Sequence, residues 1–323
     1  MQLNKVFNFL LGLLVISLSN PVAFSQTQTN KSFTEIRKPK QDLIHPLLDC
    51  ADFSSSTIRE IQNLEDSLKS YILQKKSKKE VKEVSIYYRT LNNGPWVGIN
   101  ADKKYCPASL LKVPFLIAAF KQQEYDSSFL NKMVEYYPVD GAYIKNIDNN
   151  QYMQFGNKYS IYQLLQEMII NSDNNAMEIA VNNIWNDVFE SVFYDLNIDY
   201  NAYGPEDRFI SPKQYAAYFR ILYNATYLNP YMSNLALEIL TQAKYQDGII
   251  AGLPKDVVVA HKYGERSFIN SKELELHDCA IVYDDEQPYI LCVMTRGYNF
   301  ENQTKIISEI SNMIYTANQI SKL

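Results

Sequence analysis

Ser109 and Lys112 lie three residues apart and form the only Ser-x-x-Lys in the chain. An apolar run from Ala108 to Phe120, with Pro107 just before it, predicts a helix that begins near the serine. Residues i and i+3 share a helix face, so the lysine amine can take the proton of the serine hydroxyl and activate it as a nucleophile. Backbone N–H groups at the start of that helix favour an oxyanion beside Ser109. The pattern indicates acyl transfer through a serine.

Lys112 can act as a base only if its pKa falls. Lowering a lysine pKa from ~10.4 to near 7 costs about 4.6 kcal/mol. A helix end contributes roughly 0.3–1 kcal/mol, or ~2 kcal/mol when partly buried. Burial and a second cation must therefore supply most of the effect.

Two later motifs contain further groups of this kind. Ser172-Asp173-Asn174 lies between two predicted helices, where these residue types are also ordinary helix caps. Lys262-Tyr263-Gly264 follows an apolar β run and is the only Lys-x-Gly in the chain. Lys262 is the candidate for the second cation.

The elements around these motifs predict an α/β protein of the α+β kind. The stretch from about residue 126 to 246 reads as all-helical, whereas β-rich runs occur before and after it. We therefore expect an antiparallel sheet built from the N- and C-terminal parts, flanked by helices, with a helical insert. The predicted helices are Thr57–Leu73, Ala108–Phe120, Ile161–Ile170, Ala176–Trp185, Val188–Leu196, Pro212–Tyr223, Asn234–Ala243 and Glu301–Ile320. The predicted strands are Val84–Leu91, Trp96–Ile99, Val257–Tyr263, Leu276–Tyr283 and Tyr289–Thr295.

Composition narrows the function classes. The 323 residues are 46% hydrophobic and 21% charged, a composition typical of globular proteins. The net charge of −5 does not favour nucleic-acid binding. The three histidines, His45, His261 and His277, include no close pair typical of a zinc site. No Gly-rich phosphate loop occurs, so we expect neither a metal nor a cofactor.

Residues 1–25 resemble a secretory signal, with Lys5 before an apolar run from Val6 to Leu18 and small residues at its end. We expect a periplasmic or secreted protein that is a monomer and has no stable membrane partner once the signal is cleaved. Retention of the signal as an anchor is the alternative. Residues 26–56 read as a linker, and residues 57–323 as the functional domain.

An exported chain can form disulfides from its four cysteines. Cys279 and Cys292 lie symmetrically about a predicted hairpin centre, so they could face each other across two strands. Two buried thiols are the alternative. Cys50 and Cys106 could form a second pair, although no local pattern supports it.

Taken in order, Ser-x-x-Lys, Ser-Asp-Asn and Lys-x-Gly resemble the penicillin-recognising serine enzymes, the class A β-lactamases and penicillin-binding proteins. The resemblance extends over roughly residues 57–323 and implies a β-lactamase/transpeptidase-like fold. It also implies a small-molecule β-lactam or a peptidoglycan stem peptide as the bound partner.

The resemblance implies a role for each motif residue. Ser109 attacks a carbonyl, Lys112 is the base, Ser172 relays a proton to the departing nitrogen, and Lys262 lies against Ser172. Asn174 holds Lys112 and the substrate amide, and Asp173 is structural. The backbone N–H groups of Ser109 and Glu265 form the oxyanion hole, and Gly264 leaves room for an extended substrate beside the strand.

Two positions depart from the family pattern. Tyr263 stands where the family has Thr or Ser to bind the substrate carboxylate, and Arg266, on the same strand face as Lys262, could take over that contact. Class A enzymes also carry a glutamate that activates the deacylating water, and the matching position is Phe193. Glu206 and Asp207 are the nearest carboxylates, although a solvent-facing turn is the simpler reading of both.

Three functions remain open. The first is a serine hydrolase of class A type that forms an acyl-serine with β-lactams or D-alanyl amides and deacylates slowly. The second is a cell-wall D-Ala-D-Ala carboxypeptidase or transpeptidase that β-lactams trap. The third is a non-catalytic domain that binds peptidoglycan or β-lactams, against which the intact serine and lysine set argues.

Overall fold

The computed structural model describes residues 33–37, 43–45, 47–52, 56–92, 94–139, 153–198, 204, 207–268, 270–284 and 287–320. The expected signal peptide, residues 1–25, lies outside these residues. Ser32–Leu323 forms one compact unit. None of the helices in the described part of the chain is long and apolar enough to cross a membrane.

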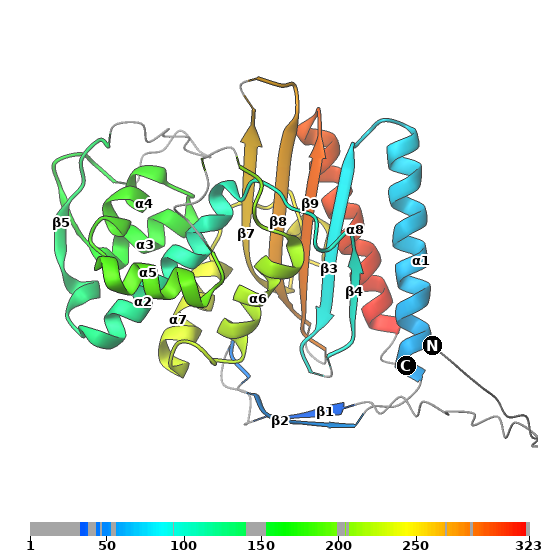
Figure 1. The fold of residues 1–323 in the computed structure, drawn as a ribbon, viewed down its shortest axis with the longest axis horizontal. Helices are drawn as coiled ribbons and strands as arrows, with labels where there is room; N and C mark the ends of the chain where they lie inside the picture. Colours follow the sequence, from blue (N-terminus) through cyan, green and yellow to red (C-terminus); the bar gives the residue numbers. More distant parts are fainter. Residues whose placement is uncertain are drawn as a thin grey trace, which may run out of the picture. The chain divides into compact units, whose positions relative to one another are not determined.

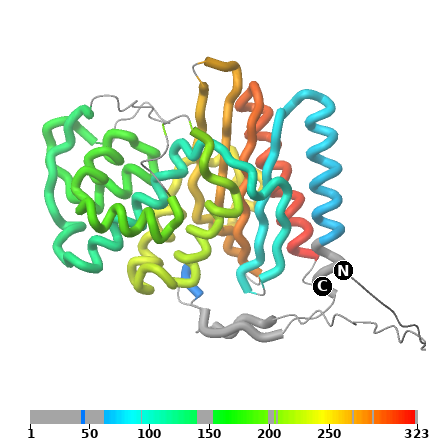
Figure 2. The backbone as a smooth tube through the Cα atoms, viewed as in Figure 1, coloured from blue at the N-terminus to red at the C-terminus, as the bar shows by residue number. Residues whose placement is uncertain are grey.

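A five-stranded antiparallel sheet forms the centre of this unit, in the order β4-β3-β9-β8-β7 (Figure 1). Its strands are β3 (Glu83–Thr90), β4 (Trp96–Ile99), β7 (Val258–Ser267), β8 (Leu274–Tyr283) and β9 (Tyr289–Gly297). β3 and β4 therefore share one sheet with β7, β8 and β9, joined through the pairing of β3 with β9, as the sequence predicts. In Figure 2 these cyan and orange segments lie side by side, although most of the chain separates them in sequence.

Helices cover both faces of the sheet. α1 (Ser56–Ser77) and α8 (Phe300–Ile320) pack on one face, where Leu68 and Ile310 are fully buried. α6 (Pro212–Tyr223), one of the helices that lie in sequence between β4 and β7, packs on the other face. Strands β8 and β9 are consequently buried almost along their whole length, which explains their nearly continuous apolar sequence.

The helical region follows the first two strands of the sheet and packs beside its β7 edge (Figure 1). Side-chain caps define its helix starts: the Ser160 side chain accepts a hydrogen bond from the Gln163 N–H, and Asp173 does the same for Ala176. Two short strands also pair within this region. Each is three residues long, which is too short to give a recognisable strand pattern in the sequence. Its elements are η1 (Ala108–Leu111), α2 (Lys112–Tyr125), η2 (Phe129–Asn131), β5 (Met133–Glu135), β6 (Lys158–Ser160), α3 (Ile161–Ile170), α4 (Asn174–Val181), α5 (Asn186–Asp195), α6 and α7 (Pro230–Thr241).

The cysteines separate into two cases. Cys279 of β8 and Cys292 of β9 are directly opposite in register and form a buried disulfide, so the hairpin prediction is confirmed. Cys106 is buried, and the side chain of Cys50 lies outside the described part of the chain.

The stretch predicted as a linker also contains regular structure. β1 (Phe33–Arg37) and β2 (Leu47–Asp52) form an antiparallel pair. Their apolar residues are too few and too interrupted by charges to give a strand pattern in sequence.

Candidate active site

Ser109 lies on a 3-10 turn, η1, and Lys112 begins α2 directly after it. The sequence predicts one continuous helix here. In a 3-10 turn residues i and i+3 eclipse each other, so the change brings the two side chains directly into line. Lys112 Nζ lies 3.3 Å from Ser109 Oγ, within reach of its proton.

The residue before the nucleophile has a strained backbone. Ala108 has φ 47°, a left-handed conformation that side chains other than glycine rarely adopt. Strain of this kind costs on the order of 1–3 kcal/mol and persists only where the surroundings hold it. Its neighbour Pro107 packs closely under β7, where a Cβ placed on Gly264 would lie 2.9 Å from the Pro107 carbonyl oxygen. Gly264 is therefore required by the packing of η1, in addition to any room that it leaves for substrate.

Lys112 Nζ is surrounded by oxygen atoms. It lies 2.5 Å from the Ser172 carbonyl oxygen, 3.0 Å from Ser172 Oγ and 2.7 Å from Asn174 Oδ1. Ser172 also has a left-handed backbone, with φ 56°, in the turn that carries its carbonyl oxygen to Lys112. The Ser-Asp-Asn turn thus contributes both a main-chain and a side-chain acceptor to one amine.

The number of hydrogen atoms on the amine then determines its chemistry. Carbonyl oxygens only accept, so Ser172 O and Asn174 Oδ1 each require an N–H from Lys112. A neutral amine has two N–H groups and one lone pair. Once the carbonyls are satisfied, the lone pair remains available for the O–H of Ser109. After it takes that proton, the third N–H can be passed to Ser172 Oγ.

Lys262 completes the group from β7. Its Nζ donates to Ser172 Oγ at 3.0 Å, so one hydroxyl bridges two lysines. Both lysines are buried, each with 1% of its surface exposed. Burial, and then the positive charge of Lys262, lower the pKa of Lys112 well below its usual value. Burial lowers the pKa of Lys262 to about 7.

Asp173 has a structural position. One of its carboxylate oxygens accepts from the Ala176 N–H at 2.8 Å, which caps α4. The other accepts from the Tyr136 hydroxyl at 2.9 Å. Tyr136 is fully buried and was not predicted from the sequence, because an isolated tyrosine carries no motif.

Tyr263 adopts a different contact from the one that a threonine would make. Its ring stacks on Tyr245 with centroids 4.0 Å apart, and Lys262 Nζ lies 4.6 Å from its centroid. An ammonium over an aromatic face is stabilised electrostatically. The phenol ring therefore faces the lysine cation. Glu265 and Arg266 follow on the same strand and are partly buried.

The position expected to hold a deacylating carboxylate is part of the core. Phe193 is buried in α5 and stacks on Phe189 at 4.3 Å and on Phe115 at 5.5 Å. Asp207 lies in an exposed turn, where it accepts from the Gly204 N–H at 2.7 Å. Glu206 lies outside the described residues.

Comparisons with solved structures show proteins of the same fold. Among solved structures, PBP-A matches with 21% identity and a TM-score of 0.68, covering 81% of this chain and 97% of its own. A leucine-to-glutamate variant of PBP-A, solved as an acyl-enzyme with penicillin G, matches with 22% identity, a TM-score of 0.68 and the same coverage. A class A β-lactamase from Mycobacterium abscessus matches with 17% identity and a TM-score of 0.66, covering 79% of this chain and 99% of its own. These identities support the fold alone.

No curated protein sequence matches the chain. A family model described as the β-lactamase enzyme family does match it, over residues 63–317. That range contains Ser109, Lys112, Ser172 and Lys262. The chain therefore belongs to the β-lactamase enzyme family and is a serine hydrolase of that type.

Proposed function

We propose that Ser109 attacks the carbonyl carbon of a β-lactam or a related D-alanyl amide and becomes an acyl-serine. The observation that carries the proposal is the environment of Lys112. Its buried amine has a lowered pKa, lies 3.3 Å from Ser109 Oγ and has two carbonyl acceptors for its N–H groups. It is thereby suited to take the serine proton as the bond between Oγ and the carbonyl carbon forms.

The proton then moves toward the leaving nitrogen. As the C–N bond of the substrate breaks, Ser172 gives its hydroxyl proton to that nitrogen and takes one from Lys112. Lys262, at 3.0 Å from Ser172 Oγ, stabilises the transient negative charge on this oxygen. Backbone N–H groups of Ser109 and Glu265 are proposed to hold the carbonyl oxygen, as the family resemblance implies.

The remaining predicted residues would position the substrate. Asn174, whose Oδ1 accepts from Lys112, is proposed to hold the substrate amide as well, as the family resemblance implies. Arg266 is the proposed partner of the substrate carboxylate, since Tyr263 is stacked against Tyr245. Gly264 lets the substrate approach the β7 edge.

We propose that the acyl-serine is hydrolysed slowly. The family resemblance matches Phe193, which is buried in the core, to the glutamate of class A enzymes, and Asp207 is exposed. Neither of these two described positions would then offer a deacylating water a positioned carboxylate. General-base help is typically worth roughly 10²–10⁴-fold in rate. Slow hydrolysis favours an enzyme that β-lactams occupy for long periods. Because β-lactams trap D-Ala-D-Ala peptidases in this way, such a peptidase is the second candidate.

Export to the periplasm or the exterior is also proposed, on the basis of residues 1–25 and the buried disulfide between Cys279 and Cys292. Disulfides form in oxidising compartments. Intact mass measurement of the protein recovered outside the cytoplasm would test it, because cleavage of the signal shortens the chain.

Labelling with a fluorescent penicillin tests the central proposal. We expect one label per chain, found by peptide mass spectrometry on Ser109, and none in Ser109→Ala. Ser233→Ala is a matched control, because Ser233 is buried and its hydroxyl donates to the Leu228 carbonyl in another part of the fold. Label that persists in Ser109→Ala, or a wild-type chain that takes none, would contradict the proposal.

A further inference from the structure

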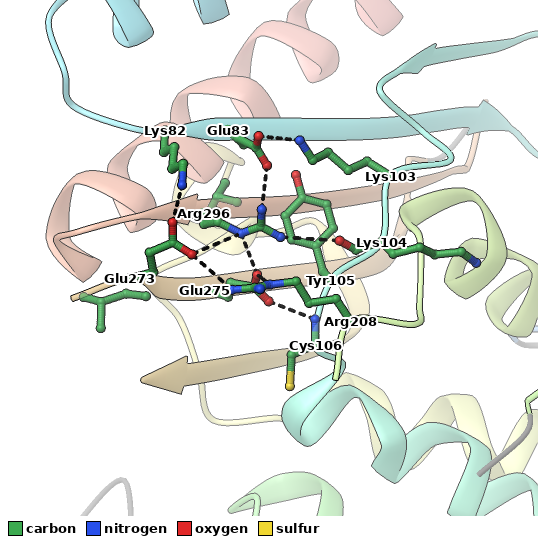
Figure 3. A network of polar contacts seen from close by, with 12 residues as sticks. Lys82, Glu83, Lys103, Lys104, Tyr105, Cys106, Arg208, Glu273, Glu275 and Arg296 are labelled. Atoms are coloured by element: carbon green, nitrogen blue, oxygen red, sulfur yellow. Dashed lines mark hydrogen bonds and ion pairs between the residues drawn. The ribbon is translucent and has the colours of Figure 1, made fainter. Parts of the chain in front are cut away.

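A row of alternating charges crosses the sheet beside the Ser109 segment. Register places Glu83 of β3 opposite Arg296 of β9, Arg296 opposite Glu275 of β8, and Glu275 opposite Arg266 of β7. Opposite charges at such positions attract. Arg296 bonds Glu83 at 2.9 Å and Glu275 at 2.7 Å (Figure 3).

Glu275 is the member of this row that touches the nucleophile segment. It is fully buried, and its Oε2 accepts from the backbone N–H of Cys106 at 2.8 Å. Its Oε1 accepts from Arg208 Nε and Arg296 Nε, each at 2.7 Å. His277, which lies two residues after Glu275 on β8, donates through Nε2 to the Cys106 carbonyl oxygen at 3.1 Å. Side chains from β8 thus hold both polar backbone atoms of one residue.

The backbone of Tyr105, the residue before Cys106, is also held, in this case by hydrogen bonds to other main-chain atoms. Tyr105 N donates to the Ile210 carbonyl at 2.8 Å, and the Tyr105 carbonyl accepts from Phe209 N at 3.0 Å. Figure 3 shows Cys106, Arg208 and Arg296 meeting at Glu275. All four polar backbone atoms of Tyr105 and Cys106 therefore have partners on other segments.

This anchoring lies two residues before the strained Ala108. A left-handed alanine relaxes if the chain on either side can move. On one side η1 packs under Gly264, and on the other the Cys106 peptide is bound to Glu275 and His277. The strain at Ala108 is thus held between two fixed points, and Ser109 follows it directly.

We propose that Glu275, with His277, is a positioning residue that fixes the Cys106 backbone and thereby the direction of Ser109 Oγ toward Lys112. Neither side chain reaches the reacting atoms, and both act through the main chain. The proposal rests on the proposed function, because it assigns the effect to the acylation of Ser109.

Glu275→Gln tests it, with Glu273→Gln as the matched control. Glu273 directly precedes β8 and its side chain accepts from the same Arg208, at 3.1 Å, but its side-chain partners are Lys82 and Arg208 and not the nucleophile segment. The glutamine at 275 keeps the shape but places an amide N–H₂ against two arginines or against the Cys106 N–H. We expect the rate constant for penicillin acylation to fall about 10–100-fold in Glu275→Gln, since a displacement of ~1 Å can cost ~10²-fold. The dissociation constant of the non-covalent complex should change less than about threefold, and Glu273→Gln should acylate within about twofold of wild type.

A second measurement needs no substrate. Hydrogen exchange followed by mass spectrometry should show faster exchange in residues 104–112 of Glu275→Gln and wild-type exchange there in Glu273→Gln. Unchanged exchange in Glu275→Gln overturns the proposal even if the protein proves not to acylate. If the wild type takes no label, the proposed function fails on its own, and exchange still decides the anchoring.

Variants of His277 provide a second test of the proposal that does not require Glu275→Gln to fold. His277→Leu removes the donor to the Cys106 carbonyl without leaving the arginines unpaired, and it should slow acylation and speed exchange in residues 104–112. His277→Gln keeps a donor at that position and should restore both toward wild type. Wild-type acylation and exchange in His277→Leu would overturn the proposal.

Discussion

Replacing Lys262 by methionine removes one of the two positive charges that share the Ser172 hydroxyl and keeps the length of the side chain. Lys112 Nζ and Lys262 Nζ each lie 3.0 Å from Ser172 Oγ, so they are no more than twice that distance apart, about 6 Å. With an effective dielectric constant of ~20, two unit charges at ~6 Å repel by about 2.8 kcal/mol. That energy is about a 100-fold change in the ratio of ammonium to amine at Lys112.

The sign of the effect follows from the charge of Lys262. The pKa of Lys262 is about 7, so below that pH it carries its charge and opposes protonation of Lys112. Without it the pKa of Lys112 rises, and the neutral amine that is proposed to act as base becomes scarce at neutral pH. The acid limb of the acylation rate should move upward by about two pH units.

The assay is the rate of labelling by a fluorescent penicillin between about pH 5 and pH 9. Lys255→Met is the control, because Lys255 is exposed ahead of β7 and its loss changes the net charge equally. The position of the limb is diagnostic, since loss of the contact with Ser172 also lowers the plateau. An acid limb that stays at its wild-type position in Lys262→Met would refute the electrostatic coupling.

Stability offers an independent check on the same lysine. An unfolded lysine keeps its proton up to about pH 10.5, whereas folded Lys262 loses it at about 7. The unfolded state thus binds more protons between these values, and the free energy of unfolding should rise with pH across that window, by up to about 5 kcal/mol. Chemical denaturation at several pH values should show that this rise is smaller in Lys262→Met. Parallel curves for the two proteins would contradict the lowered pKa.

Three further outcomes are expected. Gly264→Ala should slow acylation at least about tenfold, because the new methyl group meets the Pro107 carbonyl oxygen at 2.9 Å; labelling kinetics measure this, and a wild-type rate would contradict it. Tyr136→Phe removes the hydroxyl that donates to Asp173 and should lower the free energy of unfolding by about 1–3 kcal/mol. Urea denaturation measures this, and an unchanged value would show that water replaces the hydroxyl. A chromogenic cephalosporin should give a burst of about one product per chain and then a slow phase as acyl-Ser109 hydrolyses, and steady turnover at tens per second would show that another base deacylates it.

Local sequence signals predicted much of the fold and of the candidate site. The capped helix Ile161–Ile170 and the proline-started helix Pro212–Tyr223 have the bounds that the sequence predicts, because their start signals are local. The nearly continuous apolar run of β9 likewise predicted a strand covered on both faces. That Lys112 and Lys262 meet around Ser172 was implied by the family resemblance of the ordered motifs and not by any local signal.

The remaining features depend on contacts between distant segments. A 3-10 turn at Ser109 differs from an α-helix by only one hydrogen-bond register, which apolar spacing does not distinguish. Glu275 stands at the start of an apolar strand, where a charged residue reads as the strand's exposed end. Burial raises the pKa of Glu275, but His277, and then Arg208 and Arg296 from elsewhere in the chain, lower it to about 2. Such partners can be found only when the strands are in register.

The pairing of β3 with β9 has a consequence for how the protein is made. Glu83 of β3 lies opposite Arg296 of β9, so the centre of the sheet closes only after the chain through β9 has left the ribosome. Pairings this distant in sequence form slowly. A chain cut short before β7 would contain Ser109, Lys112 and Ser172 but neither Lys262 nor the strands that hold Cys106. Assembly of the proposed nucleophile is therefore tied to synthesis of the chain through β9, and a chain cut short before that strand lacks the complete group around Ser109.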